Sequence, residues 1–83
     1  MHVVSEVWLA ERDEFLFRVL RNGTKWTFRV PVTALQAMDT RGTPHELFDL
    51  YRASIYGTAT VIMETGDPKQ QQTIAAIKTG AKA

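Results

Sequence analysis

The dipeptide Asn22-Gly23 constrains the fold of this chain more than any other feature, because it lies between two apolar segments. Asn and Gly accommodate positive φ at the two central positions of a type I′ turn, which joins antiparallel strands most tightly. We therefore predict a β-hairpin made of residues Phe15 to Arg21 and Thr24 to Val30. A two-residue turn also fixes the register of the two strands.

This register separates apolar from charged side chains. One face receives three apolar pairs: Val19 with Trp26, Phe17 with Phe28, and Phe15 with Val30. The opposite face receives Leu16, Arg18 and Leu20, which lie across from Arg29, Thr27 and Lys25. A slip by one residue would mix aromatic rings with cations, so the pattern supports the register. We expect the aromatic face to be the core face.

The longest stretch with helical periodicity runs from Thr43 to Glu64. Thr43 can cap a helix, Pro44 suits its first position, and Glu46 can complete a capping box. Apolar residues then recur at three- and four-residue steps, which places them on one side of the helix: Leu47, Tyr51, Ile55, Thr58 or Ala59, and Ile62. We predict one long helix that covers the aromatic face of the hairpin.

Three further segments complete the predicted elements. Residues Met1 to Ala10 are mostly apolar and precede a charged cluster, so we predict a short first strand followed by a turn. Val32 to Met38 should form a helix of about two turns, because Thr33 and Gln36 have the spacing of a capping box. Lys69 to Thr79 fits either a helix or a weak strand. We expect residues 79–83 to be a loose tail.

Together these elements predict a single α+β domain over residues 1–83. Its antiparallel sheet has three to four strands, and one short and one long helix pack on one face. The hydrophobic content of 45% and charged content of 23% are ordinary globular values. The chain has no cysteine and no apolar run of about 18 residues, so we expect a cytoplasmic protein without disulfides, thiolate metal sites or membrane segments.

The chain resembles a family of small bacterial proteins, domain of unknown function 1488. The resemblance is carried by residues at matching spacings: Trp8, Phe17, Leu20, Asn22-Gly23, Val30, Leu35, Thr43-Pro44 and Tyr51-Arg52. It implies an antiparallel sheet covered by two helices, with a fourth strand near Thr73 to Lys78. The chain departs from the family where members usually carry a second Arg after the aromatic-Arg pair. The resemblance implies no activity.

The predicted outer face of the hairpin is the first candidate site. Leu16 and Leu20 would lie there beside Arg18, Lys25 and Arg29, and no other segment is an obvious cover for them. Apolar side chains flanked by the aliphatic stems of Lys and Arg can form a continuous contact patch. We therefore predict a non-enzymatic interaction or accessory module, which forms a homo-oligomer or binds an unknown protein partner.

Arg52 is the second candidate, as a contact for an anion or for a carboxylate of a partner. The structural alternative, which we favour, pairs Arg52 with Asp49 or Tyr56, or with carbonyl groups near Thr40.

His45 and Asp49 are four residues apart, close enough on a helix to hold one metal ion together. A third ligand is missing, because Glu46 points elsewhere around the helix and His2 is distant in sequence. We predict no metal, no cofactor and no catalytic residue. Weak nucleic-acid binding through the basic outer face is the alternative function. A net charge of +1 and inward-facing aromatic rings disfavour it.

Overall fold

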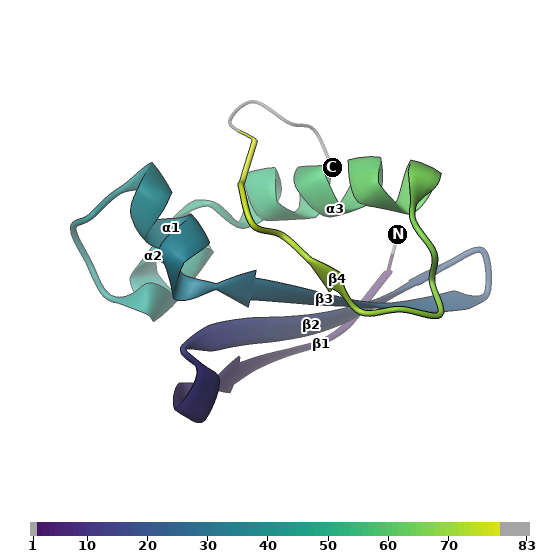
Figure 1. Ribbon diagram of the computed structural model, residues 1–83, viewed down its shortest axis with the longest axis horizontal. Helices are drawn as coiled ribbons and strands as arrows, with labels where there is room; N and C mark the ends of the chain where they lie inside the picture. The colour runs from purple at the N-terminus through teal and green to yellow at the C-terminus, as the bar shows by residue number, and fades with distance from the viewer. Residues whose placement is uncertain (1, 79–83) are drawn as a thin grey trace.

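The computed structural model describes residues 2–78 as a four-stranded sheet with three α-helices on one face (Figure 1). The strands are β1 (His2–Leu9), β2 (Glu14–Arg21), β3 (Thr24–Pro31) and β4 (Gln72–Thr73), in that spatial order. The helices are α1 (Val32–Met38), α2 (Pro44–Leu50) and α3 (Arg52–Thr65). A short 3-10 helix, η1 (Ala10–Arg12), joins β1 to β2. The fold is α+β with a mostly antiparallel sheet, as predicted.

The hairpin of β2 and β3 has the predicted register throughout. Asn22 and Gly23 have φ angles of 52° and 77°, as a type I′ turn requires. Phe17 lies opposite Phe28, and both side chains are completely buried, with ring centroids 5.2 Å apart. The aromatic face is therefore the core face.

β1 forms one edge of the sheet and pairs antiparallel with β2. Its register shifts between Val3 and Ser5, which leaves Val4 without a partner on β2 and 50% exposed. Such a bulge kinks an edge strand and makes it a poorer template for pairing with another chain. Beyond the bulge, Val7 lies opposite Leu16 and Trp8 opposite Phe15, so β1 extends both faces of the hairpin.

The predicted long helix is wrong in one respect, because it is divided into α2 and α3 at Tyr51. Tyr51 has φ −104° and ψ 14°, outside the range of a regular helix. The Tyr51 amide still donates to Leu47, and its carbonyl accepts from Ile55, so hydrogen bonding continues through the bend. The bend brings Phe48 against Phe15, with ring centroids 4.4 Å apart, while α3 runs along the sheet (Figure 1). A straight helix could not follow both directions.

Of the two predicted capping boxes, only the one at Thr43 is present. The Thr43 hydroxyl accepts from the Glu46 amide at 3.2 Å, and the Glu46 carboxylate accepts from the Thr43 amide at 2.9 Å. The box predicted at Thr33 is wrong, because Pro31 is the N-cap of α1 and no side chain caps that helix. Pro31 also ends β3, so α1 begins directly where the strand stops.

The fourth strand is shorter than the resemblance implies, and it is parallel to β3 rather than antiparallel. Phe28 pairs with Gln72 and Arg29 with Thr73, and the Ile74 amide then donates to the Arg29 carbonyl at 2.8 Å. The direction follows from the path of the chain. After the helices have crossed back over the sheet, the chain re-enters it near the hairpin turn and must run the same way as β3 (Figure 1).

The core lies between the sheet and the helices. Its fully buried side chains include Phe17, Phe28, Phe48, Leu35, Ile55 and Ile74. After β4 the chain rises toward α3, where the Lys78 amide donates to the Thr58 hydroxyl at 3.1 Å (Figure 1). This segment therefore covers the open side of the core beyond β3. The tail predicted at residues 79–83 lies outside the described residues.

Candidate functional site

All five residues of the predicted interaction surface belong to the face of the sheet opposite the helices. Alternation along the strands and the observed register place them there: Leu16, Arg18 and Leu20 on β2, Lys25 and Arg29 on β3. β1 adds Val7 beside Leu16 and His2 beside Leu20. We call the five predicted residues, together with Val7, the outer sheet face.

The apolar members of the outer sheet face are only partly accessible to solvent. Leu20 is 38% exposed and Val7 is 41% exposed, whereas Leu16 is half-buried among its neighbours. None of the three helices lies on this side (Figure 1). Sequence reasoning missed Val7, although alternation in β1 would have placed it beside Leu16 once the register of that strand was known.

One predicted cation of this face, Arg29, is already paired within the chain. Its Nε and Nη2 atoms donate to the two carboxylate oxygens of Glu14 at 2.6 and 2.7 Å. These bonds lower the pKa of the Glu14 carboxyl, against the opposing effect of its burial. Because Glu14 offsets the charge of Arg29, the free positive charge of the outer sheet face comes from Arg18 and Lys25, which have no acidic partner among residues 2–78.

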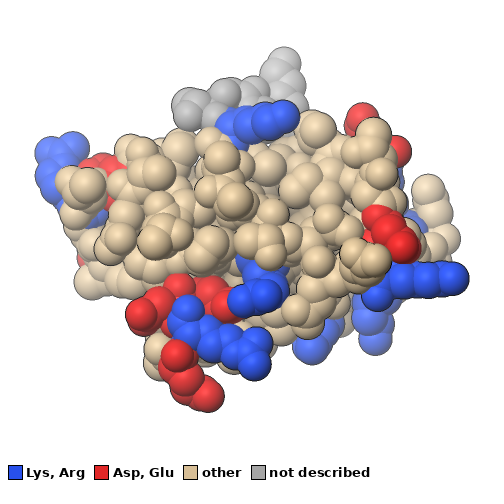
Figure 2. Space-filling view, in the orientation of Figure 1, with Lys and Arg blue, Asp and Glu red and all other residues tan. Residues whose placement is uncertain are grey.

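Charges are divided unevenly along the sheet side of the molecule. Figure 2 shows this side as the lower edge, where acidic and basic side chains are mixed toward the left. That end carries η1 and the turn after it, with Glu11, Arg12 and Asp13 all exposed. Toward the hairpin end of the lower edge, only basic side chains project. The rim of the sheet side thus carries charges of both signs at the η1 end and basic side chains at the hairpin end (Figure 2).

Arg52, the other candidate, makes ion pairs with two elements. Its Nε and Nη2 atoms donate to the two oxygens of Glu6 on β1, each at 3.1 Å, and Nη2 lies 2.8 Å from a carboxylate oxygen of Asp49. The hydrogen bonds to Glu6 raise the pKa of the Arg52 guanidinium, while partial burial acts against them. Its Cζ atom lies 5.2 Å from the centre of the Phe48 ring. Arg52 therefore fastens the start of α3 to the edge strand.

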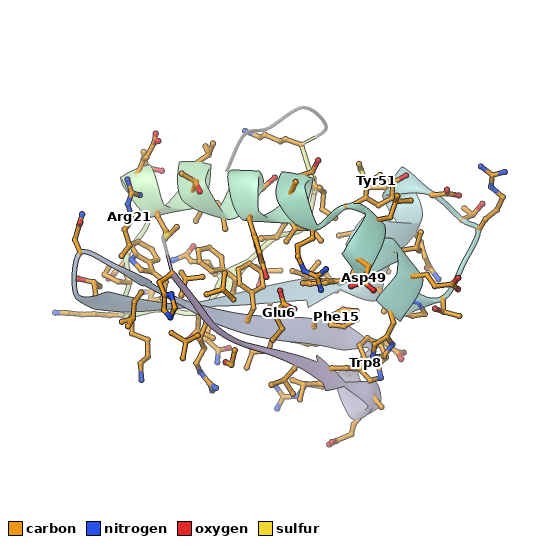
Figure 3. The ribbon with its side chains drawn as sticks, turned by 180° about the vertical axis from the view of Figure 1, so that it is seen from behind. Glu6, Trp8, Phe15, Arg21, Asp49 and Tyr51 are labelled. Atoms are coloured by element: carbon orange, nitrogen blue, oxygen red, sulfur yellow. The ribbon has the colours of Figure 1, made fainter. Side chains whose placement is uncertain are left out.

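The pairing with Asp49 is the structural alternative considered for Arg52, and the pairing with Glu6 was not foreseen. Glu6 and Arg52 are far apart in sequence, and only the register of β1 brings them together. Figure 3 shows Glu6 and Trp8 on the side of β1 that faces α2, with Asp49 across from them.

His45 packs between aromatic rings rather than in a cluster of metal ligands. Its ring centroid lies 5.4 Å from that of Trp8 and 5.2 Å from that of Phe15, in edge-to-face geometry. In the described range, no three side chains of the ligand types His, Asp and Glu are grouped to hold a metal ion. No helix formed by residues 2–78 has the length and apolarity to cross a membrane.

No protein-family model and no curated protein matches this chain. Among solved structures, it is similar to a protein of unknown function from Shewanella loihica PV-4, assigned to the family domain of unknown function 1488. The two structures agree with a TM-score of 0.70 over 88% of each chain, at 14% sequence identity. The chain has the fold of this family.

The resemblance to domain of unknown function 1488 that the residues indicate is thus confirmed in three dimensions. Two of the residues that carry it, Trp8 and Arg52, line the same small cleft beside β1. The similar protein is itself of unknown function, so this family adds a fold and no activity.

Proposed function

We propose that this chain is a non-enzymatic interaction module that forms a dimer through its outer sheet face. The observation that carries the proposal is the one-sided cover of the sheet: the helices lie on one face, while Leu20 and Val7 on the other face remain about two-fifths exposed. Exposed apolar side chains with cations around them are typical of contact sites. The lack of cysteine agrees with action in the cytoplasm.

The charges of this face favour a second copy as the partner. A twofold axis that lies in the plane of the interface, perpendicular to the strands, would place the basic hairpin end of one copy over the η1 end of the other, and the reverse. Lys25, at the hairpin end of β3, would then lie toward Glu11 and Asp13 of the partner copy. Such an arrangement pairs opposite charges twice, and opposite charges guide both register and association rate.

The size of the face predicts a reversible dimer. Three strands of eight residues span about 27 Å by about 14 Å at the usual spacings of a sheet, or roughly 400 Å² in projection. A typical stable interface buries about 800 Å² on each partner. We therefore expect a dimer that dissociates on dilution.

Sedimentation velocity over a wide range of concentration tests the proposal. The wild type should shift from a species near the chain mass of 9.4 kDa toward twice that mass as concentration rises. The double substitution Leu16→Glu/Leu20→Glu should keep the chain monomeric, and circular dichroism should show that it remains folded. If the half-buried Leu16 makes that variant unstable, Val7→Glu/Leu20→Glu changes only the more exposed positions.

Leu50→Glu is the matched control, because Leu50 is 67% exposed on the helix side of the molecule. It should dimerise like the wild type. Charge reversal tests the twofold arrangement: Lys25→Glu should weaken the dimer, and the added change Glu11→Lys should restore it. A wild type that stays monomeric at every concentration, or loses its dimer only with Leu50→Glu, would contradict the proposal.

Nucleic-acid binding through Arg18 and Lys25 is the competing interpretation of the same surface. It predicts retention on heparin that falls steeply with salt and is lost in Lys25→Glu. The dimer proposal predicts elution at low salt. The Phe17, Trp26 and Phe28 rings that could stack on bases are buried on the other face, which supports the dimer.

A further inference from the structure

A small cleft lies between β1 and α2, separate from the outer sheet face. Its volume is about 150 Å³. Aromatic rings from three elements line it: Trp8 from β1, Phe15 from β2, and His45 and Phe48 from α2. The Trp8 and Phe15 rings are 4.8 Å apart between centroids, so the rings form a continuous wall (Figure 3).

The charged side chains of the cleft are unequal in number. Glu6 and Asp49 are carboxylates, and Arg52 is the only cation in the lining of this cleft. One formal negative charge is therefore left over. The Asp49 side chain is 70% exposed, so one face of its carboxylate is open to a ligand. The cleft thus combines aromatic surface with a net negative charge.

Arg52 shows that these groups already accept a cation. Its guanidinium lies over the Phe48 ring and between the two carboxylates. Aromatic faces attract cations, and more strongly when water is partly excluded. An anion at the guanidinium of Arg52 would lie beside two carboxylates that already pair with it. The geometry therefore disfavours the anion contact predicted for Arg52.

We propose that this cleft binds an alkylammonium group of the size of a lysine side chain. An engineered protein cavity of about 150 Å³ holds a benzene molecule, so an aliphatic chain of about four carbons with its ammonium group fits the volume. The chain would contact the rings of Trp8 and His45, which are more exposed than Phe15 and Phe48, and the ammonium would donate hydrogen bonds to Asp49. This site goes beyond the proposed dimer, because it uses the other side of β1.

An NMR titration with n-butylammonium chloride tests the site. The indole N–H signals of Trp8 and Trp26 are assigned from the variant Trp8→Phe, in which the Trp8 signal is missing. The Trp8 signal should shift and saturate, while the Trp26 signal, from the core beyond the cleft, should not move. Sodium butyrate has the same chain with opposite charge, and at equal ionic strength it should leave the Trp8 signal in place. A saturable shift with butyrate of equal affinity would overturn the proposal, as would a Trp8 signal that n-butylammonium does not move.

Two variants separate the cleft from a general charge effect. Asp49→Asn removes the exposed carboxylate and should weaken butylammonium binding by about two- to fivefold, the range of a single exposed ion pair. Glu64→Gln makes the same change of charge near the end of α3, away from the cleft, and should leave binding unchanged. Equal affinities for wild type and Asp49→Asn would contradict the role of the carboxylate and overturn the proposal.

A comparison of probes distinguishes the source of the ammonium. N-acetyl-lysine methylamide carries the same group on a peptide backbone. If it binds more tightly than n-butylammonium, the result supports a lysine side chain of a protein; if n-butylammonium binds as tightly or more so, the result supports a free amine. Failure of the dimer would leave both outcomes unaffected, since neither measurement depends on self-association.

Discussion

The carboxylate of Glu14 is almost inaccessible to solvent, although it lies on the face of the sheet that no helix covers. Two hydrogen bonds from Arg29 hold it there. A carboxylate in this position needs its partner, because burial without compensation would favour the protonated form. The pair therefore makes the stability of the fold depend on the charge of one carboxyl group.

We expect this dependence to be visible in acid. The hydrogen bonds from Arg29 place the folded-state pKa of Glu14 below its ordinary value of 4.5. The pair therefore stabilises the fold above pH 4.5, and this contribution is lost as pH falls through the lower folded-state pKa. Thermal melts of Glu14→Gln should show a smaller loss of Tm in that acidic range than the wild type. Glu11→Gln, the same change at an exposed position, should keep the wild-type slope.

Phe28 tests the hairpin register by its contribution to the core. Its ring stacks on Phe17 and lies 6.2 Å from Trp26 between centroids, with no exposed surface. Phe28→Ala should lower the free energy of unfolding by about 3 to 5 kcal/mol, because it removes the ring and leaves a cavity. A urea melt measures the difference. A loss under about 1 kcal/mol would be incompatible with a fully buried ring.

At the scale of the element, the structure provides an experiment on helix capping with its own control. Thr43 caps α2 with its side chain, whereas Thr33 lies in the first turn of α1 and caps nothing. Thr43→Ala should cost about 1 kcal/mol of stability, because it leaves the Glu46 amide without an acceptor. Thr43→Asp should be neutral or stabilising, since it keeps an acceptor and adds negative charge at the N-terminus.

Thr33→Ala should cost less than about 0.5 kcal/mol, the usual range for an exposed substitution without a special role. Chemical denaturation of the three variants gives the comparison directly. Equal losses for Thr33→Ala and Thr43→Ala would indicate that the difference in capping is wrong.

Local signals were sufficient for some elements and insufficient for others. The turn at Asn22-Gly23 and the cap at Thr43 depend on residues a few positions apart, and both are present as predicted. The bend at Tyr51 leaves every neighbouring apolar position at helical spacing, so periodicity alone could not reveal it. The capping box predicted at Thr33 is absent, because the N-cap of α1 is Pro31, and Thr33 already lies inside the helix.

The candidate site was predictable to the same extent. Alternation placed Leu16, Leu20 and Lys25 on one face, because the turn fixed the register. The pairing of Arg29 with Glu14 joins two strands of the sheet, and the pairing of Glu6 with Arg52 joins the edge strand to α3. Sequence spacing contains no information on such contacts. The cleft beside β1 is lined by residues of two strands and two helices. It could therefore be found only in three dimensions.

At the scale of the whole molecule, the four strands differ in how much chain lies between them. Short connections join β1, β2 and β3, whereas β4 meets β3 only after all three helices. Closing the longer loop costs more chain entropy, so contacts of this kind tend to form late in folding. We expect the hairpin to be structured in the folding transition state and Ile74, which follows β4, to dock afterwards.

Stopped-flow kinetics can separate these two steps. Ile74→Ala should accelerate unfolding and leave the refolding rate nearly unchanged, whereas Gly23→Ala, which strains a positive φ of 77°, should slow refolding. Refolding slowed equally by Ile74→Ala would place β4 in the nucleus instead. If the rates separate as expected, the parallel strand determines how long the folded state survives, and the hairpin how quickly it is reached.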